Sequence, residues 1–324
     1  MMENLVSVII PAYNSGKTIE KCVNSILKST YSTLEVLVID DGSTKSDALI
    51  YDDLRKISEK IKIIHQKNTG VSGARNSGID CAQGEYITFV DADDTIEPEL
   101  IYTLIDDCKV NQADISVCGY KEYLDEMKYL NFASDTKKTL NCSEALECFL
   151  TSNNIGWSVW GKLFKKSTIG EVRFKLGKKT AEDMFFVYEV LKRANKVIVD
   201  DALLYNYIKQ NDSAMADLNC EKFFDTYELI SEVYKDNLYN QKLRIAQSEF
   251  YLSKMLWFFR FISYQDKENN YYKQIKRART CFFNNLELEK IKYTNKQIIE
   301  LFLLKNLYPI YRFLVKGVKY GKKL

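Results

Sequence analysis

The first 110 residues alternate short apolar runs with amphipathic segments. Four runs of five or six residues are mostly apolar and β-branched and too short for helices, so they predict buried strands. Between them, apolar residues recur at helical spacing, which predicts helices that bury one face. The expected strands are Val6–Ile10, Leu34–Ile39, Ile61–His65 and Tyr86–Val90, and the expected helices are Ile19–Leu27, Ala48–Ile57, Ala74–Ala82 and one that Pro98 begins.

This alternation predicts an α/β fold in which helices cover both faces of a mostly parallel sheet. Ligands of such sheets bind at the carboxyl ends of the strands. Three of the expected strands end in polar clusters, so the clusters share one crevice if these strands are parallel neighbours. The clusters are Tyr13-Asn14, Asp40-Asp41-Gly42 and Asp91-Ala92-Asp93-Asp94.

The third cluster places three carboxylates within four positions, Asp91 to Asp94. Like charges this close repel, and a divalent cation offsets them; oxygen ligands favour Mg²⁺ or Mn²⁺ over Zn²⁺. The alternative is a polar turn before the next helix, since Asp is a good helix cap. The crevice lacks G-x-G-x-x-G and the P-loop pattern, so we expect a metal-dependent nucleotide site without a glycine cradle for phosphate.

The pattern changes after residue 115. A strand is expected at Ile115–Gly119, a polar excursion or hairpin at Glu122–Lys138, and a helix at Ser143–Leu150 with Ser143 as its cap. Trp157 and Trp160 are then expected either to form a lid over a ligand or to anchor the core, because aromatic side chains stack on ligands and also bury a large area.

Two adjacent acids, Glu182 and Asp183, precede an apolar helix. Acids at a helix start are stabilising through the helix dipole, and this alone explains one of them. It would not explain a pair that lay in the crevice, which sequence alone does not show.

From Leu218 the chain is expected to be helical and rich in Lys, Tyr and Phe, and residues 218–300 could pair with a second copy. The segment Phe250–Ile262 is either a core helix or a partner-facing one. The stretch Ile298–Leu324 mixes apolar and basic residues and has no acid after Lys305, which predicts contact with an anionic membrane surface. The alternative is a terminal helix that packs on its domain.

Length, charge and the His and Cys content indicate which partners and metal sites are to be expected. The 324 residues suit one large domain or two smaller ones, and the net charge of +2 gives no reason to expect nucleic acid as a partner. The single His, His65, argues against a His-rich metal site. The eight Cys lack zinc-ligand spacing, so reduced core cysteines are expected, among them Cys22, Cys81, Cys108 and Cys148. No signal-peptide pattern or membrane-spanning stretch is found, so a cytoplasmic chain is expected.

Five stretches of the sequence form a linked set: Ser7–Asn14, Val38–Thr44, Asn68–Asn76, Asp91–Asp94 and Glu182-Asp183. Together they resemble the family 2 glycosyltransferases, inverting enzymes of the GT-A fold. The resemblance implies a GT-A catalytic domain over residues 1–215, with a nucleotide-binding half (1–110) and an acceptor-side half (111–215). Beyond about residue 215 there is no resemblance, and the sequence pattern alone predicts a C-terminal helical region (216–324) with a basic amphipathic tail. Trp160-Gly161-Lys162-Leu163 and Tyr205-Asn206-Tyr207 are similar to members that decorate bacterial surface polysaccharides and teichoic acids.

The resemblance also implies roles for individual residues. Asp183 would be the general base, and Asp93 would bind Mn²⁺ or Mg²⁺ with Asp91. One departure concerns the diphosphate: Ile208 stands where related enzymes often carry Arg, so Lys209 and Ser213 are expected there instead. The nucleotide would contact Pro11, Ala12, Tyr13 (by stacking), Asp41 (with the base, usually uracil), Arg75 and Asp91, and the donor sugar would contact Asp94, Glu182 and Trp160.

The resulting hypothesis is a metal-dependent, inverting transfer of a sugar from a UDP-sugar to a hydroxyl of a glycan. A lipid-linked acceptor at the inner face of the cell membrane would explain the basic amphipathic end of the chain. Two alternatives remain open. One is a non-catalytic partner subunit of a glycosyltransferase complex, and the other is a sugar nucleotidyltransferase, whose basic phosphate loop is missing here.

Overall fold

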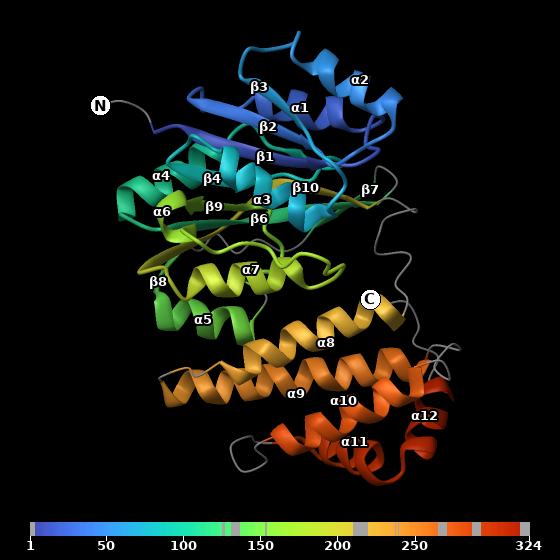
Figure 1. Cartoon of the computed structure of the whole chain (residues 1–324). Coiled ribbons are helices and arrows are strands. Elements are labelled where there is room, and N and C mark those ends of the chain that lie inside the picture. Colours follow the sequence, from blue (N-terminus) through green and yellow to red (C-terminus); the bar gives the residue numbers. More distant parts are fainter. Residues whose placement is uncertain are drawn as a thin grey trace. The chain divides into compact units, whose positions relative to one another are not determined.

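The structure is a computed structural model that describes residues 4–124, 127–130, 137–152, 154–209, 220–236, 238, 240–264, 271–286 and 293–317. The chain divides into two compact units, Met1–Asp217 and Leu218–Leu324. Each unit is described by itself. The first contains a large sheet with helices on both faces, and the described part of the second is helical (Figure 1).

The sheet begins with four parallel strands in the order β3-β2-β1-β4, which confirms the strands and the parallel pairing expected for the first 110 residues. A short strand, β9, then runs antiparallel between β4 and β6, and β10 pairs parallel with β6. The strands are β1 (Val6–Ala12), β2 (Leu34–Asp40), β3 (Ile61–His65), β4 (Tyr86–Phe89), β5 (Thr95–Ile96), β6 (Ile115–Leu124), β7 (Met127–Leu130), β8 (Lys137–Asn141), β9 (Lys162–Lys165) and β10 (Lys196–Lys209).

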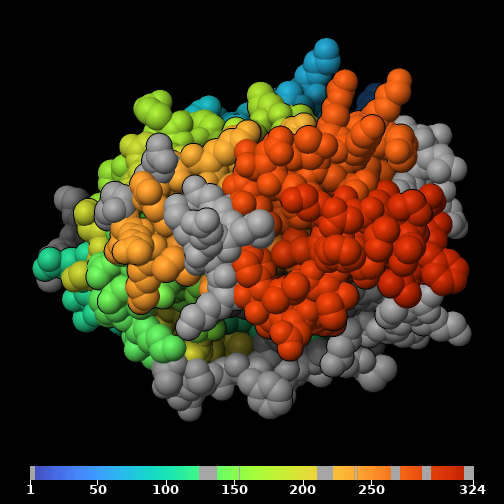
Figure 2. All heavy atoms as spheres, turned by 90° about the horizontal axis from the view of Figure 1, so that it is seen from below, coloured from blue at the N-terminus to red at the C-terminus, as the bar shows by residue number. Residues whose placement is uncertain are grey.

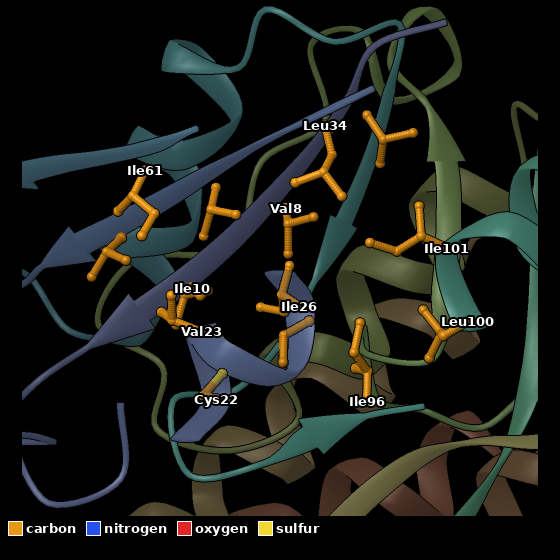
Figure 3. Packing of buried hydrophobic residues seen from close by; sticks show 14 of the residues in the cluster. Val8, Ile10, Cys22, Val23, Ile26, Leu34, Ile61, Ile96, Leu100 and Ile101 are labelled. Carbon is orange, nitrogen blue, oxygen red and sulfur yellow. The ribbon is translucent and has the colours of Figure 1, made fainter. Parts of the chain in front are cut away.

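Helices cover the two faces of this sheet. On one face α1 and α4 pack against the strands; Figure 3 shows Val8 and Ile10 of β1 against Cys22, Val23 and Ile26 of α1. On the other face, a Cβ at Gly78 of α3 would lie 2.4 Å from a methyl group of Ile9, so only glycine permits this approach. The helices of this unit are α1 (Ile19–Leu27), α2 (Lys45–Leu54), α3 (Val71–Cys81), α4 (Leu100–Asn111), α5 (Cys142–Thr151), α6 (Lys166–Ile169) and α7 (Glu182–Leu191).

Several expected boundaries were wrong. Helix α2 begins at Lys45 because the Thr44 hydroxyl caps it, α3 begins at Val71, and Pro98 lies before the first turn of α4. The cap of α5 is Asn141 rather than Ser143, since Asn141 and Glu144 form a reciprocal capping box.

Two other expectations have clear outcomes. Cys22 and Cys108 are buried as expected, but Cys81 is exposed at the end of α3 and Cys148 is half-buried. The polar segment after residue 121 contains a hairpin, in which Lys121–Leu124 pairs antiparallel with Met127–Leu130.

The second unit is built around aromatic side chains. Phe250, Met255, Leu256, Phe258 and Ile262 of α9 are buried, so this segment is a core helix. Rings from neighbouring helices stack in the interior, such as Phe223 on Phe261 at 3.6 Å between centroids. Within the described residues, every helix is too short or too polar to cross a membrane. The helices are α8 (Cys220–Lys235), α9 (Gln241–Tyr264), α10 (Tyr272–Asn285), α11 (Asn295–Asn306) and α12 (Tyr308–Gly317).

Candidate active site

Three strands bring the predicted polar clusters to one edge of the sheet. Strand β1 lies between β2 and β4, parallel to both, so the carboxyl ends of all three meet there. The Asp41 N–H donates to the Ala12 carbonyl at 2.9 Å, and Val90, next to Asp91, donates to the Ile9 carbonyl at 3.0 Å. The expected meeting of the three clusters at one edge of the sheet is therefore confirmed, and parallel sheets place their sites at this edge.

Asp41 fixes the loop that follows β3. The residue is 3% exposed. One oxygen, Oδ1, accepts from the Gln66 amide at 2.7 Å and from the Thr69 N–H at 2.9 Å. The other, Oδ2, accepts only from the Gly70 N–H, at 2.8 Å, among the described residues. A carboxylate oxygen has room for more than one donor, so Oδ2 can still receive an N–H from a ligand.

The neighbouring residues of the expected nucleotide pocket lie where a ligand can reach them. Ala12 is buried and Pro11 half-buried, whereas the Tyr13 ring is 55% exposed beside them. An exposed ring next to two apolar side chains offers a flat face for stacking. The roles of Pro11, Ala12 and Tyr13 in binding a base stay predictions.

Arg75 joins two parts of the site that are far apart in the sequence. This α3 side chain is buried, and its guanidinium lies between the loop after β4 and the start of α7. Nη1 donates to Asp183 Oδ1 at 2.5 Å and to Glu182 Oε1 at 3.4 Å, and Nη2 donates to Asp91 Oδ1 at 3.1 Å. Glu182 and Asp183 therefore lie close to the loop that contains Asp91, which a cap at a helix start does not require.

The charges of this cluster act on each other. Burial opposes the charge of Arg75, but Asp183, Asp91 and Glu182 together raise its pKa above the ordinary value. Burial, with Glu182 and Asp91, raises the pKa of Asp183 to about 8, against the opposing effect of Arg75. The Asp183 side chain remains 20% exposed, so a substrate can reach it. A carboxylate with a raised pKa is suited to accept a proton.

Asp93 has no cationic partner among the described residues. Burial, followed by the negative charge of Asp91, raises its pKa, and no ion pair joins it to another described residue. Within the described ranges, no group of three or more His, Cys, Asp or Glu is placed to hold a metal, so the protein would offer the pair Asp91 and Asp93. Mg²⁺ commonly binds through one or two carboxylates plus substrate phosphates, and Mn²⁺ accepts the same oxygen ligands, so the residues fit either ion.

Asp94 has a different environment from its two neighbours. It is 1% exposed. Its Oδ2 accepts from the Tyr205 hydroxyl at 2.7 Å and its Oδ1 from the Ile208 N–H at 2.8 Å. The same hydroxyl accepts from the Asp91 N–H at 3.2 Å. Burial and the charge of Asp91 raise the pKa of Asp94 to about 8. Asp94 and Tyr205 thus tie the carboxylate loop to β10, while contact of Asp94 with a donor sugar stays a prediction.

Trp160 belongs to a stack of aromatic rings beside this link. Its ring lies 4.5 Å from Tyr205 at an angle of 9° and 5.7 Å from Tyr207 at 16°, while Tyr120 meets it edge-on. It is partly buried against the core, so the structure favours an anchor, and contact with a donor sugar stays a prediction. Trp157 is half-buried.

The roles of Lys209 and Ser213 in binding the diphosphate stay predictions. The Lys209 ammonium pairs with Glu122 Oε1 at 2.5 Å, so a phosphate would have to compete with this carboxylate. Ser213 lies outside the described residues. The sequence analysis assigned no role to Tyr205, although it noted the Tyr-x-Tyr motif. The partners of its hydroxyl, Asp94 and Asp91, lie 111 and 114 positions away in the sequence.

Comparisons with known proteins agree on one family. The family model described as Glycosyl transferase family 2 matches residues 7–167. The chain is 32% identical over 228 residues to glycosyltransferase EpsJ of Bacillus subtilis, which covers 69% of this chain and 66% of that protein. It is 32% identical over 224 residues to glycosyltransferase GlyG of Streptococcus pneumoniae, covering 66% of this chain and 74% of that protein.

The fold is also similar to a solved structure. The crystal structure of residues 1–349 of S. aureus TarS in complex with UDP-GlcNAc has a TM-score of 0.75 and 20% sequence identity, and covers 96% of this chain and 90% of that one. At this identity the likeness concerns the fold, which is an α/β arrangement followed by helices.

Proposed function

Because the chain belongs to glycosyl transferase family 2, we propose that it transfers a sugar from a UDP-sugar to a hydroxyl of a bacterial surface glycan. The observation that carries this proposal is the Arg75 bridge, which places the candidate base Asp183 beside the carboxylate loop that contains Asp91. The similarity in fold to a protein bound to UDP-GlcNAc supports a uridine diphosphate as the leaving group.

The proposed reaction is a single displacement. The acceptor oxygen attacks the anomeric carbon from the face opposite the diphosphate, and the bond from that carbon to the phosphate oxygen breaks with its electron pair on UDP. Asp183 takes the proton of the acceptor hydroxyl. This path inverts the anomeric carbon and needs no covalent intermediate.

The carboxylates divide the remaining work. Asp91 and Asp93 would hold Mg²⁺ or Mn²⁺, which when bound neutralises charge on the leaving diphosphate. Asp41 and the loop it fixes would face the base, with Tyr13 stacked on it. Arg75 keeps the start of α7 next to the carboxylate loop, so that base and leaving group act on the same anomeric carbon.

A substitution separates this enzyme from a non-catalytic partner subunit. Asp183→Asn keeps the size of the side chain but removes the proton acceptor. We expect turnover to fall by about 10²–10⁴-fold, the usual contribution of a general base. UDP affinity, measured by calorimetry, should change little. A subunit that only binds would show no turnover in either protein, and unchanged turnover would show that Asp183 is not the base.

We further propose that the acceptor is lipid-linked and that α11 and α12 contact an anionic membrane surface. These helices carry large apolar side chains on their exposed faces, and their surface is drawn in red in Figure 2. From Leu301 to Gly317 the sequence has basic residues but no acid, which suits anionic headgroups. The exposed apolar residues are Ile298, Ile299, Phe302, Leu307, Ile310, Phe313 and Leu314.

Vesicle sedimentation tests this surface. The full chain should bind phosphatidylglycerol vesicles more strongly than phosphatidylcholine vesicles, and the double variant Phe302→Glu/Phe313→Glu should lose the binding. Val110→Glu is the matched control, since Val110 is 72% exposed on α4 of the other unit. Equal binding by all three proteins would refute the membrane proposal. Wild-type dimers that the double variant abolishes, without vesicle binding, would identify a second copy as the partner.

A further inference from the structure

Lys162, in β9, is a buried cation to which the proposed reaction assigns no role. The residue is 2% exposed. Its ammonium donates to the Ser158 carbonyl at 2.6 Å, its one hydrogen bond among the described residues. An ammonium has three donors, and burying it with one partner costs free energy. A buried residue with such a cost is expected at a functional site, where its positive charge acts on neighbouring groups.

The main chain around Lys162 is firmly held next to the carboxylate loop. The Thr88 hydroxyl of β4 donates to the Lys162 carbonyl at 2.8 Å, and the Cys118 N–H of β6 donates to the Gly161 carbonyl at 2.9 Å. Trp160 forms a bridge with Phe89, two residues before Asp91. The segment from Ser158 to Lys162 therefore lies beside the end of β4.

The direction of the side chain follows from the strand. Residues two apart in a strand point to the same face, so Lys162 lies on the face of Phe164, whose ring packs against Phe186 of α7. Trp160 instead packs against Tyr205 on the opposite face. Between them Gly161 has a φ of 65°, which is not a strand conformation, so the alternation of faces is broken there. The left-handed φ is accessible to glycine without strain.

Lys162 is thus on the face of the sheet that α7 covers, and Asp183 stands at the start of that helix. Burial lowers the pKa of Lys162 to about 8, while the thiol of Cys118 and the carboxylate of Asp183 oppose this shift. The other charged groups close to Asp183 are Arg75 of α3, Glu182 of α7 and Asp91 after β4. The negative charges of Glu182 and Asp91 offset part of the stabilisation that Arg75 gives to the ionised form of Asp183.

We propose that Lys162 is a positioning residue of the transfer site. Its ammonium holds the turn from Ser158 to Gly161, and with it the Trp160 ring, and its positive charge on the α7 face helps to keep Asp183 ionised. The second half of this role rests on the proposed function, because it assumes that Asp183 accepts a proton. The first half is a statement about the folded chain and is tested without any substrate.

Three variants separate the two halves. Lys162→Met removes the charge and the hydrogen bond with little change in volume, and Lys162→Gln removes the charge but keeps an N–H donor. Lys196→Met is the matched control, because the Lys196 ammonium also donates to a main-chain carbonyl, that of Asn111 at 2.7 Å, at the start of β10. Urea unfolding first shows whether each variant is folded. If one of the two Lys162 variants does not unfold cooperatively, the tests below are carried out on the other Lys162 variant.

The substrate-free test uses the indole signals of the three Trp in a nitrogen-15 NMR spectrum, assigned with Trp160→Phe. We expect Lys162→Met to shift or broaden the Trp160 signal and to leave Trp257, in the other unit, unchanged. The control Lys196→Met should leave both signals unchanged. A Trp160 signal identical to wild type in both Lys162 variants would overturn the positioning role, whatever the chain catalyses.

The catalytic test uses the pH dependence of kcat with a UDP-sugar and its acceptor. Loss of the charge should move the acid limb of the profile upward by about one pH unit, so that kcat falls about tenfold on that limb, with KM nearly unchanged. Lys162→Gln should show the same move. A profile equal to wild type in both would overturn the action on Asp183. Absence of turnover in the wild type counts against the proposed function and against this half only.

Discussion

The Tyr205 hydroxyl joins the carboxylate loop to β10, and its removal tests how much this link stabilises the fold. Tyr205→Phe deletes one oxygen and keeps the ring that stacks on Trp160 at 4.5 Å. That oxygen donates to Asp94 Oδ2 at 2.7 Å and accepts from the Asp91 N–H at 3.2 Å. Asp94 is 1% exposed, so water does not replace the lost donor.

The magnitude follows from the two groups left without this partner. A buried polar group that loses its hydrogen bond costs about 1–3 kcal/mol. Asp94 keeps the Ile208 N–H, which limits its loss. We therefore expect the free energy of unfolding to fall by about 2–3 kcal/mol, which corresponds to a drop in Tm of roughly 4–12 °C for a unit of this size.

Urea and thermal unfolding, followed by circular dichroism, measure this change, and Tyr207→Phe is the matched control. Tyr207 also stacks on Trp160, at 5.7 Å, but its hydroxyl has no partner among the described residues. The control should change the free energy of unfolding by less than about 0.5 kcal/mol. Equal losses in the two variants would refute the link between the carboxylate loop and β10.

Two further predictions concern charged groups. Arg75→Met leaves Asp91, Glu182 and Asp183 without their shared cation. We expect the free energy of unfolding, measured with urea, to fall by about 3–5 kcal/mol. Arg75→Lys should recover only part of this loss, because an ammonium lacks the planar fork of a guanidinium. A loss below about 1 kcal/mol would contradict the buried bridge. The hydrogen bond to Asp40 at 2.7 Å is the main cause that raises the pKa of His65 in the folded protein. Protonated His65 therefore stabilises the fold, and this contribution is complete below about pH 6.5 and is lost as pH rises through the folded-state pKa. The single His gives one C2–H NMR signal, and Asp40→Asn should return its pKa toward 6.5; a pKa at or below 6.5 in the wild type would contradict the pairing.

Local patterns were sufficient for the first half of the sheet. Strands β1 to β4 are mostly apolar runs that alternate with helical patterns, and parallel pairing followed from that alternation. The Asn141 cap was also readable, because Glu144 lies three residues after Asn141, the spacing of a capping box, whereas Leu146 lies three after Ser143.

The rest of the site depends on contacts that no local pattern carries. Arg75 meets Asp183 across 108 positions and Asp94 meets Tyr205 across 111. Strand β9 enters the sheet antiparallel, and this is what places Lys162 between β4 and β6. A lysine in a strand usually marks a solvent-facing position, so its burial here reflects tertiary structure that the sequence pattern hides.

Release of UDP from a panel of UDP-sugars, with Mn²⁺, Mg²⁺ or EDTA, tests the central claim most directly. We predict slow hydrolysis of one UDP-sugar by the wild type without acceptor, abolished by EDTA and by Asp93→Ala. The claim would be contradicted if no UDP-sugar were hydrolysed and calorimetry detected no binding of UDP in the presence of either metal.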